Sequence, residues 1–265
     1  AKSRDPLVRN FLIIREAFLN LLGMSQYAMA SRHFFAAHLA ARLDRIRRSR
    51  MGGGQDARVR AVLDESSSVE RLAALDHKCR DAVVSGGLSF LLVQRILIAF
   101  ARRRDTRFGP LVEAVHSPYL DRGAGTAAYT LRGGELWDAY CLRRRRWEGL
   151  FPDRIAQFVA NYAANYWMRG PFTASTDLLT HVLHLLARVA VIRFLLFNHP
   201  ALEDLGGQES SRSFAESALD RAVVEVVYTF SREVDHSDQL ADLLDKVLAQ
   251  CRVRGLHQVP DLARF

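Results

Sequence analysis

Apolar residues recur at three- and four-residue spacing along most of the chain, which is the pattern of amphipathic helices. The first stripe runs from Leu7 to Leu22 and carries its apolar side chains on one helix face. We predict helices over residues 7–22, 25–46, 59–63, 69–84, 88–102, 135–150, 153–168, 177–198, 213–231 and 237–252.

Glycine, proline and capping residues divide these helices. Glycines at 52–54 and at 86–87 break the pattern, and residues 110–134 form the least regular stretch. Ser66-Ser67-Ser68, Thr176-Asp177 and Ser237-Asp238 provide helix caps. Alternation with a period of two is scarce, so strands are few or absent. We therefore predict an all-α fold with many helices in a single domain.

Length and composition narrow the class of protein. The chain has 265 residues, of which 49% are apolar and 25% charged, so a disordered tail, a fibre or a membrane bundle is excluded. Polar residues interrupt the longest apolar stretch, 178–202, and the N-terminus lacks the hydrophobic region of a signal peptide. We expect no membrane partner and a cytoplasmic location.

The three cysteines and the charges change this picture in different ways. Cys79, Cys141 and Cys251 lie far apart, which fits buried thiols better than a disulfide framework or a metal site.

The formal net charge is +8, with 26 basic and 15 acidic residues in 1–150 but 11 basic and 14 acidic residues in 151–265. We divide the chain into a basic helical region, 1–134, and a C-terminal helical region, 135–265, that share one core.

A repeated Asn-Tyr pair is the first candidate for chemistry. Asn161 and Asn165 lie four residues apart on one helix face, with Tyr162 and Tyr166 beside them. Asn is unfavourable inside helices because its side chain competes for backbone hydrogen bonds. The pair therefore indicates buried amides with dedicated partners, and its role is either structural or ligand-binding.

A second candidate is the segment 230–236. Arg232, Asp235 and His236 are spaced i, i+3 and i+4, which brings their side chains within reach on an α-helix. A carboxylate beside an imidazole fixes its tautomer and raises its basicity, and an arginine can hold an anion in two hydrogen bonds. A cluster at a helix end is the alternative interpretation.

Two further groups have weaker patterns. His181, His184 and Arg188 share one face, but no third ligand completes a metal site, so we predict no metal ligands and a semi-buried polar edge. The arginine runs 102–104 and 143–146 form a basic surface, and Tyr140 and Trp147 flank the second run. Such a surface can bind phosphates and stack on bases, or it can simply be solvated.

Taken in order, these motifs resemble the flagellin lysine-N-methylase family. The resemblance rests on Leu150-Phe151-Pro152, the Asn161–Arg169 helix, the long apolar helix that follows, and Phe230-Ser231-Arg232 with Asp235-His236. It is clearest from 135 to 250, and 7–46 is similar to a helical pair of the family. The family's Cys-rich segment is not in this sequence, so an iron–sulfur cluster is expected only if such a segment exists.

The resemblance implies methyl transfer from S-adenosylmethionine to lysine side chains of flagellin. A lysine amine is protonated at pH 7 and must lose its proton first, so His236, oriented by Asp235, is the candidate base. The tyrosines at 162 and 166 can contact the sulfonium, as can Trp167. The arginine at 232 can hold the cofactor carboxylate, and the asparagines at 161 and 165 can read adenine or peptide amides.

Two other classes of function stay open. One is a non-enzymatic helical binding or regulatory protein whose basic region meets an acidic partner or nucleic acid, although no DNA-binding signature is present. The other is a small-molecule sensor with a pocket between helices 153–168, 177–198 and 213–232.

Overall fold

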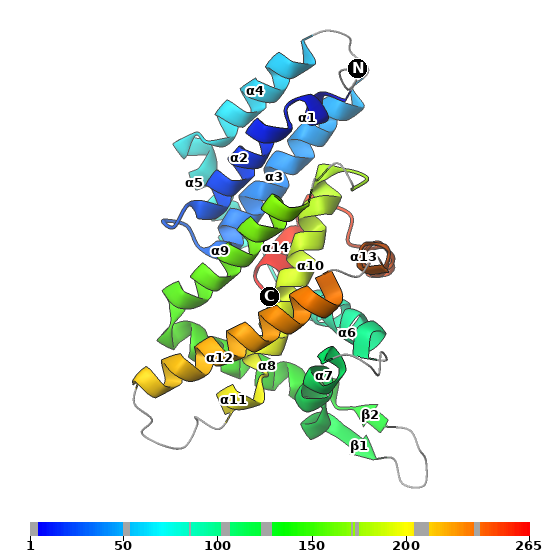
Figure 1. Cartoon of the computed structure of the whole chain (residues 1–265). Coiled ribbons are helices and arrows are strands. Elements are labelled where there is room, and N and C mark those ends of the chain that lie inside the picture. The colour runs from blue at the N-terminus through cyan, green and yellow to red at the C-terminus, as the bar shows by residue number, and fades with distance from the viewer. Residues whose placement is uncertain are drawn as a thin grey trace. The chain divides into compact units, whose positions relative to one another are not determined.

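Helices make up most of the described part of the chain in the computed structural model, which confirms the all-α prediction (Figure 1). The structure describes residues 5–49, 54–84, 86–101, 107–122, 129–170, 172, 175–203, 212–235 and 239–265. The chain forms two compact units, 1–89 with 156–189 and 248–265, and 90–155 with 190–247. Each unit draws residues from both sides of position 134.

The first unit is built around α3 (Met29–Arg48), which packs against neighbours on several sides. These neighbours are α2 (Phe11–Gly23), α4 (Gln55–Ser66), α5 (Val69–Asp81) and the short C-terminal α14 (Val259–Ala263). Alanines at 36, 37 and 40 lie fully buried on α3, and their small side chains let these neighbours come close. The short α1 (Pro6–Arg9) precedes α2 and contacts α4.

Two longer helices bring later parts of the sequence into this unit. They are α9 (Pro152–Arg169), from residue 156 onward, and α10 (Leu178–Phe197), up to residue 189. Ser68 caps α5 by accepting from the Arg71 N–H at 3.3 Å, and Asp177 accepts from the Thr180 N–H at 2.7 Å. The caps expected at these two positions are therefore confirmed, whereas Ser237-Asp238 lies outside the described residues.

The second unit has a core of aliphatic residues with several aromatic rings among them. Its helices are α6 (Gly87–Ala101, from residue 90), α7 (Phe108–His116), α8 (Gly133–Leu150), α11 (Pro200–Glu203), α12 (Arg212–Phe230) and α13 (Gln239–Gln250). Tyr140 of α8 packs 5.4 Å from the ring of Phe194, and Phe108 of α7 packs 6.1 Å from Phe230. Rings from distant parts of the sequence thus close this core.

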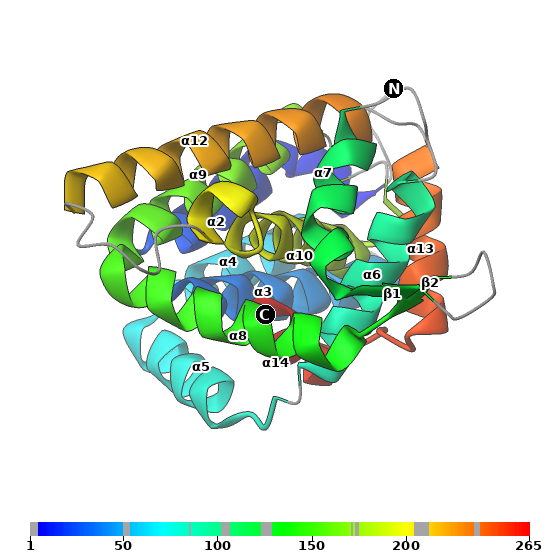
Figure 2. The ribbon, with the colours of Figure 1, turned by 90° about the horizontal axis from the view of Figure 1, so that it is seen from below.

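Residues 110–134 contain more structure than the sequence pattern predicts. Helix α7 includes Pro110, which is tolerated because the first turn of a helix has no intrahelical partners for its N–H groups. Strands β1 (Leu120–Arg122) and β2 (Tyr129–Leu131) then pair antiparallel, with Leu120 opposite Leu131, and lead into α8 (Figure 2). This hairpin agrees with the expectation of few strands.

Helix α10 is apolar and long enough to cross a membrane, but 89% of its most apolar 18-residue stretch is buried inside the chain. Burial of this kind is expected of a core helix. His181, His184 and Arg188 are among its buried residues, so the helix brings polar groups into the interior. The semi-buried edge expected for these three residues is in fact fully buried.

Candidate functional site

A buried polar and aromatic cluster in the first unit contains one of the predicted site residues, Tyr166. The Tyr166 hydroxyl of α9 donates to the backbone carbonyl of His181 at 3.2 Å and also lies 3.2 Å from its Nδ1. The Ser175 hydroxyl lies 3.1 Å from the same nitrogen. Two hydroxyl groups therefore lie within hydrogen-bond distance of the same nitrogen of the His181 imidazole, whose ring centroid is 4.6 Å from that of Tyr166.

Burial keeps this imidazole neutral. His181 is only 5% exposed, and burial, followed by the nearby His184 and Arg188, lowers its pKa from 6.5 to about 3. Its Nε2 atom has no hydrogen-bond partner among the described residues. A buried nitrogen without a partner is costly to the fold. The sequence pattern alone did not select His181 as a site residue, because burial is not visible in spacing.

The aromatic rings around His181 are already engaged. Trp167 stacks on Phe18 of α2 at 4.0 Å and meets the His181 ring edge-on at 4.8 Å. The guanidinium of Arg188 lies 5.1 Å from the Tyr166 ring centroid. The Tyr166 ring thus already interacts with a cation through its π face, while Trp167 is 1% exposed and has one face covered.

Asp44 on α3 fixes the start of the helix that carries His181. Its carboxylate accepts from the backbone N–H groups of Leu178 at 3.0 Å and Leu179 at 2.9 Å. Asp44 is 1% exposed, and burial raises its pKa above 3.8 although these two hydrogen bonds oppose that change. The buried carboxylate of Asp44 therefore satisfies two backbone N–H groups at the N-terminus of α10 that have no partner within the helix.

The two asparagines of the Asn-Tyr repeat share a face, as predicted, but the face is exposed. Asn161 and Asn165 are both exposed, and the Oδ1 atom of Asn161 accepts from Gln157 Nε2 at 2.8 Å on the same helix. The expectation of buried amides with dedicated partners is therefore wrong. The buried face of α9 belongs instead to its aromatic residues, Tyr162 and Trp167 among them.

The Arg232–Asp235 segment belongs to the second unit and differs from the expected α-helix. Residues Ser231–Asp235 form a π-helical turn, whose i→i+5 hydrogen bonds alter the α-helical spacing and which occurs frequently at functional sites. Arg232 is exposed and donates to the Tyr228 hydroxyl at 2.6 Å, a hydrogen bond that raises the pKa of the guanidinium. Asp235 is half-buried, and His236 lies outside the described residues, so their pairing stays a prediction.

Glu233 has a structural role that the sequence analysis missed. Its two carboxylate oxygens accept from the backbone N–H groups of Arg107 at 3.0 Å and Phe108 at 2.9 Å. The π-helical turn is thereby tied to the N-terminus of α7. No local signal identifies this pair, because the partners are more than 120 residues apart in sequence.

The arginine run on α8 is largely paired within the second unit. Arg143 donates to Asn198 Oδ1 at 2.8 Å and to the Tyr119 hydroxyl at 3.2 Å, and Arg144 lies 3.3 Å from Glu148. The flanking rings, Tyr140 and Trp147, are 0% and 1% exposed. Stacking of these two rings on bases, one of the two interpretations of this run, is therefore excluded.

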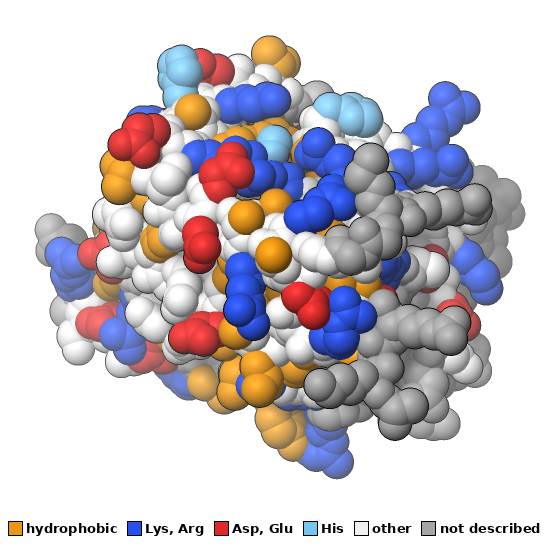
Figure 3. Space-filling view, turned by 90° about the horizontal axis from the view of Figure 1, so that it is seen from above, with side chains coloured by type: hydrophobic (Ala, Val, Ile, Leu, Met, Phe, Trp, Pro, Cys, Tyr) orange, Lys and Arg blue, Asp and Glu red, His pale blue; other side chains and the backbone are white. Residues whose placement is uncertain are grey.

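Charged side chains of both signs lie together on the face drawn in Figure 3, where Lys and Arg occur among Asp and Glu. Arg102–Arg104 lies outside the described residues. The three cysteines are free thiols, and no three metal-binding side chains come together in the part of the chain that the structure describes.

Comparison with known proteins identifies one relationship. A family model described as the FliB lysine N-methylase C-terminal domain matches residues 15–259, which is nearly the whole chain. No curated protein matches the chain, and no solved structure matches it. The match includes the Asn-Tyr helix, the His181 cluster and the π-helical turn.

Proposed function

The chain belongs to the family of the FliB lysine N-methylase C-terminal domain, and on this basis we propose that it acts as a protein lysine N-methyltransferase with flagellin as its substrate. The observation that carries the proposal is the extent of the match, from residue 15 to residue 259. A match of this length includes all the proposed site residues and most helices of both units. We place the reaction in the cytoplasm, which agrees with three free thiols.

S-adenosylmethionine, when bound, supplies the methyl group. The chemistry of the first unit fits such a ligand, because the His181 Nε2 and Trp167 Nε1 atoms are buried without hydrogen-bond partners among the described residues. We propose that Tyr162 and Tyr166 contact the sulfonium, which for Tyr166 takes the place of the Arg188 guanidinium 5.1 Å from its ring. We further propose that Asn161 and Asn165, on the exposed face, bind adenine or peptide amides. An iron–sulfur cluster is proposed only for a Cys-rich segment outside this sequence.

The second unit contributes the charged groups of the proposal. Arg232 is exposed, and we propose that its guanidinium binds a carboxylate, at the expense of its hydrogen bond to Tyr228. Asp235 orients His236, which takes the proton from the substrate ammonium. Each of these residues is given its role from the chemistry of its own side chain, inside the second unit.

His181 is unsuitable as the base, even though it is an imidazole beside Tyr166. A lysine ammonium has a pKa of about 10.4, and a proton moved to a group with a pKa of about 3 costs about 10 kcal/mol. His181 therefore serves as a positioning residue for the Tyr166 hydroxyl. His236 is therefore the proposed base.

A methyl-transfer assay tests the proposal. Purified protein, S-adenosylmethionine and flagellin monomers are incubated together, and intact-mass spectrometry counts the methyl groups added to flagellin. We expect methylation of lysine, with a large loss for Arg232→Gln. The matched control is Arg145→Gln, because Arg145 of α8 is also an arginine on a helix surface and bonds a backbone carbonyl. Absence of methylation by the unsubstituted chain contradicts the proposal.

A further inference from the structure

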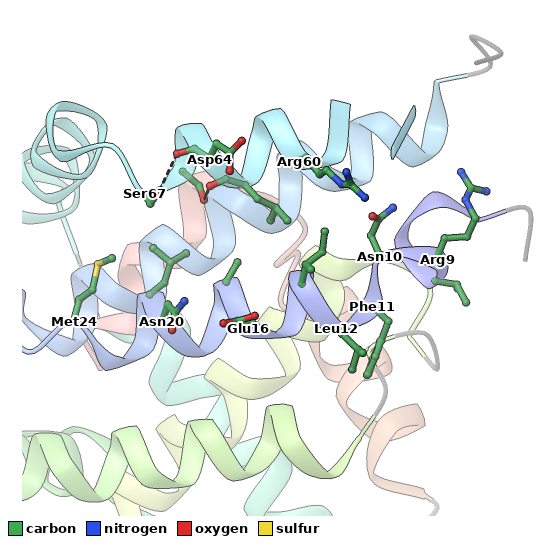
Figure 4. Close-up of a pocket in the computed structure, with 16 residues that line it drawn as sticks. Arg9, Asn10, Phe11, Leu12, Glu16, Asn20, Met24, Arg60, Asp64 and Ser67 are labelled. Carbon is green, nitrogen blue, oxygen red and sulfur yellow. Dashed lines mark hydrogen bonds between the residues drawn. The ribbon is translucent and has the colours of Figure 1, made fainter. Parts of the chain in front are cut away.

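A hollow in the first unit lies apart from the residues assigned above. Helices α2 and α4 both pack on α3, and a cavity of about 850 Å³ lies along them. Its lining comes from α1, α2 and α4 and from the turns that follow α2 and α4. Figure 4 shows α2 and α4 running in the same direction, with Arg9 and Arg60 toward one end and Met24 and Ser67 toward the other. We call this hollow the α2–α4 groove.

The groove has apolar side chains that the fold leaves in water. Leu12 is 66% exposed, and its neighbours Val8 and Ile13 are 38% and 37% exposed. These three residues line the groove together with other apolar groups, among them Leu63 of α4. A clustered apolar surface of this kind marks a binding surface more often than scattered exposed residues do. At 13 residues, α2 is about 20 Å long, enough for several turns of a bound helix.

The charges in the groove select the kind of occupant. Glu16 of α2 and Asp64 of α4 both line it and are exposed, and neither carboxylate has an ion pair or side-chain hydrogen bond within the described residues. Figure 4 places them on the two helices at the middle of the groove. At the end near α1, Asp56 neutralises Arg9 at 2.8 Å, while Arg60 adds one positive charge.

We propose that the α2–α4 groove docks an amphipathic helix of the protein substrate, with apolar side chains on the Leu12 surface and a lysine between Glu16 and Asp64. A helix laid in an apolar groove is a recurrent mode of peptide recognition. The carboxylates of Glu16 and Asp64, which have no side-chain partner in the described part of the chain, give the charge complementarity for a lysine, and Arg60 fixes the direction by favouring an acidic residue at its end. The inference rests on the proposed function and adds to it a place where the substrate is held.

Fluorescence anisotropy with a defined peptide tests the groove without requiring catalysis. The probe is a labelled synthetic helix with leucines on one face and lysines beside them, and its counterpart has glutamates in place of the lysines. We expect the protein to bind the lysine peptide, the glutamate peptide to bind far more weakly, and the double variant Glu16→Gln/Asp64→Asn to lose about tenfold in affinity for the lysine peptide.

The matched control removes the same net charge elsewhere. Glu70 and Glu113 are exposed and lie outside the groove lining, so the double variant Glu70→Gln/Glu113→Gln should bind like the unsubstituted protein. Equal affinity of the two double variants overturns the proposal, as does a lack of binding by the unsubstituted protein.

A second variant separates docking from folding and from self-association. Leu12→Gln alters a side chain that is mostly in water, so the thermal unfolding midpoint should not change while peptide affinity falls at least fivefold. Sedimentation velocity is measured on the same samples. If the protein forms dimers that Leu12→Gln abolishes, a second copy of the chain is the occupant and the proposal is wrong.

Flagellin methylation then distinguishes the two proposals. If the unsubstituted protein methylates flagellin, Glu16→Gln/Asp64→Asn should raise KM about tenfold and leave kcat unchanged. An unchanged KM overturns the groove and leaves the proposed function intact. If no version methylates flagellin, the proposed function fails, and the peptide titration still supports or overturns the groove by itself.

Discussion

Two segments whose polar residues are predicted to share a helix face have opposite environments in this protein. The α9–α10 cluster of the first unit and the π-helical turn of the second both contain polar residues three or four positions apart. In the first, His181 and Arg188 are buried and share contacts with Tyr166 of another helix. In the second, Arg232 is exposed and bonds Tyr228 one turn away.

Sequence spacing does not determine the environment of a helix face. Spacing identifies the residues that share a helix face, but the burial of that face decides whether the pKa values of its residues are shifted. Burial lowers the pKa of His181 from 6.5 to about 3, whereas the hydrogen bond to Tyr228 raises the pKa of Arg232, which stays charged in solvent. The two segments should therefore respond differently to substitution, and four predictions follow in order of expected size.

The largest difference concerns aromatic packing in the buried cluster. Trp167→Ala removes a ring that is 1% exposed and stacked on Phe18, and should lower the free energy of unfolding by about 3–5 kcal/mol. The adjacent Met168 is 56% exposed, so Met168→Ala should change it by less than about 0.5 kcal/mol. Urea unfolding followed by circular dichroism measures both. Equal effects would show that the ring does not hold α9 against α2.

The next prediction uses the protonation state of His181. In the unfolded chain its pKa is near 6.5, and in the folded state it is about 3, so acid protonates the unfolded state first. The stability contributed by neutral His181 is complete above pH 6.5 and is lost as the pH falls toward 3, at about 1.4 kcal/mol per pH unit. Between pH 7.5 and pH 5 the loss is about 2 kcal/mol.

His181→Gln should remove that part of the pH dependence. Urea unfolding at pH 7.5 and pH 5 measures it, and His77→Gln is the control because His77 is on the surface. His38, whose pKa is lowered to about 4 by burial and by nearby basic residues, contributes equally in both variants. The same pH dependence in His181→Gln as in the unsubstituted protein would contradict the prediction.

Glu233 should have an intermediate effect in the other segment. Glu233→Ala leaves the N–H groups of Arg107 and Phe108 without their carboxylate, and should cost about 1–2 kcal/mol, as loss of a helix cap does. Hydrogen exchange at the Phe108 amide reports the loss directly. Glu113→Ala is the control, because Glu113 lies on the exposed face of α7, the helix whose N-terminus Glu233 contacts. Unchanged exchange at Phe108 would show that Glu233 does not cap α7.

The smallest effects on stability are expected at the exposed candidate residues. Arg232→Gln and Asn161→Ala should each change the free energy of unfolding by less than about 0.5 kcal/mol, because both side chains are exposed. Thermal unfolding measures this change, and the methylation assay is run on the same samples. A drop in stability comparable to that of Trp167→Ala would assign these residues a structural role.

Much of the fold could be predicted from local patterns, because most helices carry their own apolar stripe and cap. The helix at 178–197 and its Asp177 cap were predicted, whereas α7 was obscured by Pro110. The candidate site was predictable only in part. Tyr166 was identified from its repeat, but its contact with His181 and the Asp44 cap depend on tertiary packing between residues far apart in sequence.

Isothermal titration of S-adenosylmethionine into the purified chain is the most direct test of whether these helices form a methyltransferase. We expect saturable binding with one molecule per chain, and weaker binding to Tyr166→Phe and to Arg232→Gln than to the Arg145→Gln control. An absence of binding heat over a wide temperature range, with a chain that circular dichroism shows to be folded, would contradict the proposal that these helices hold the methyl donor.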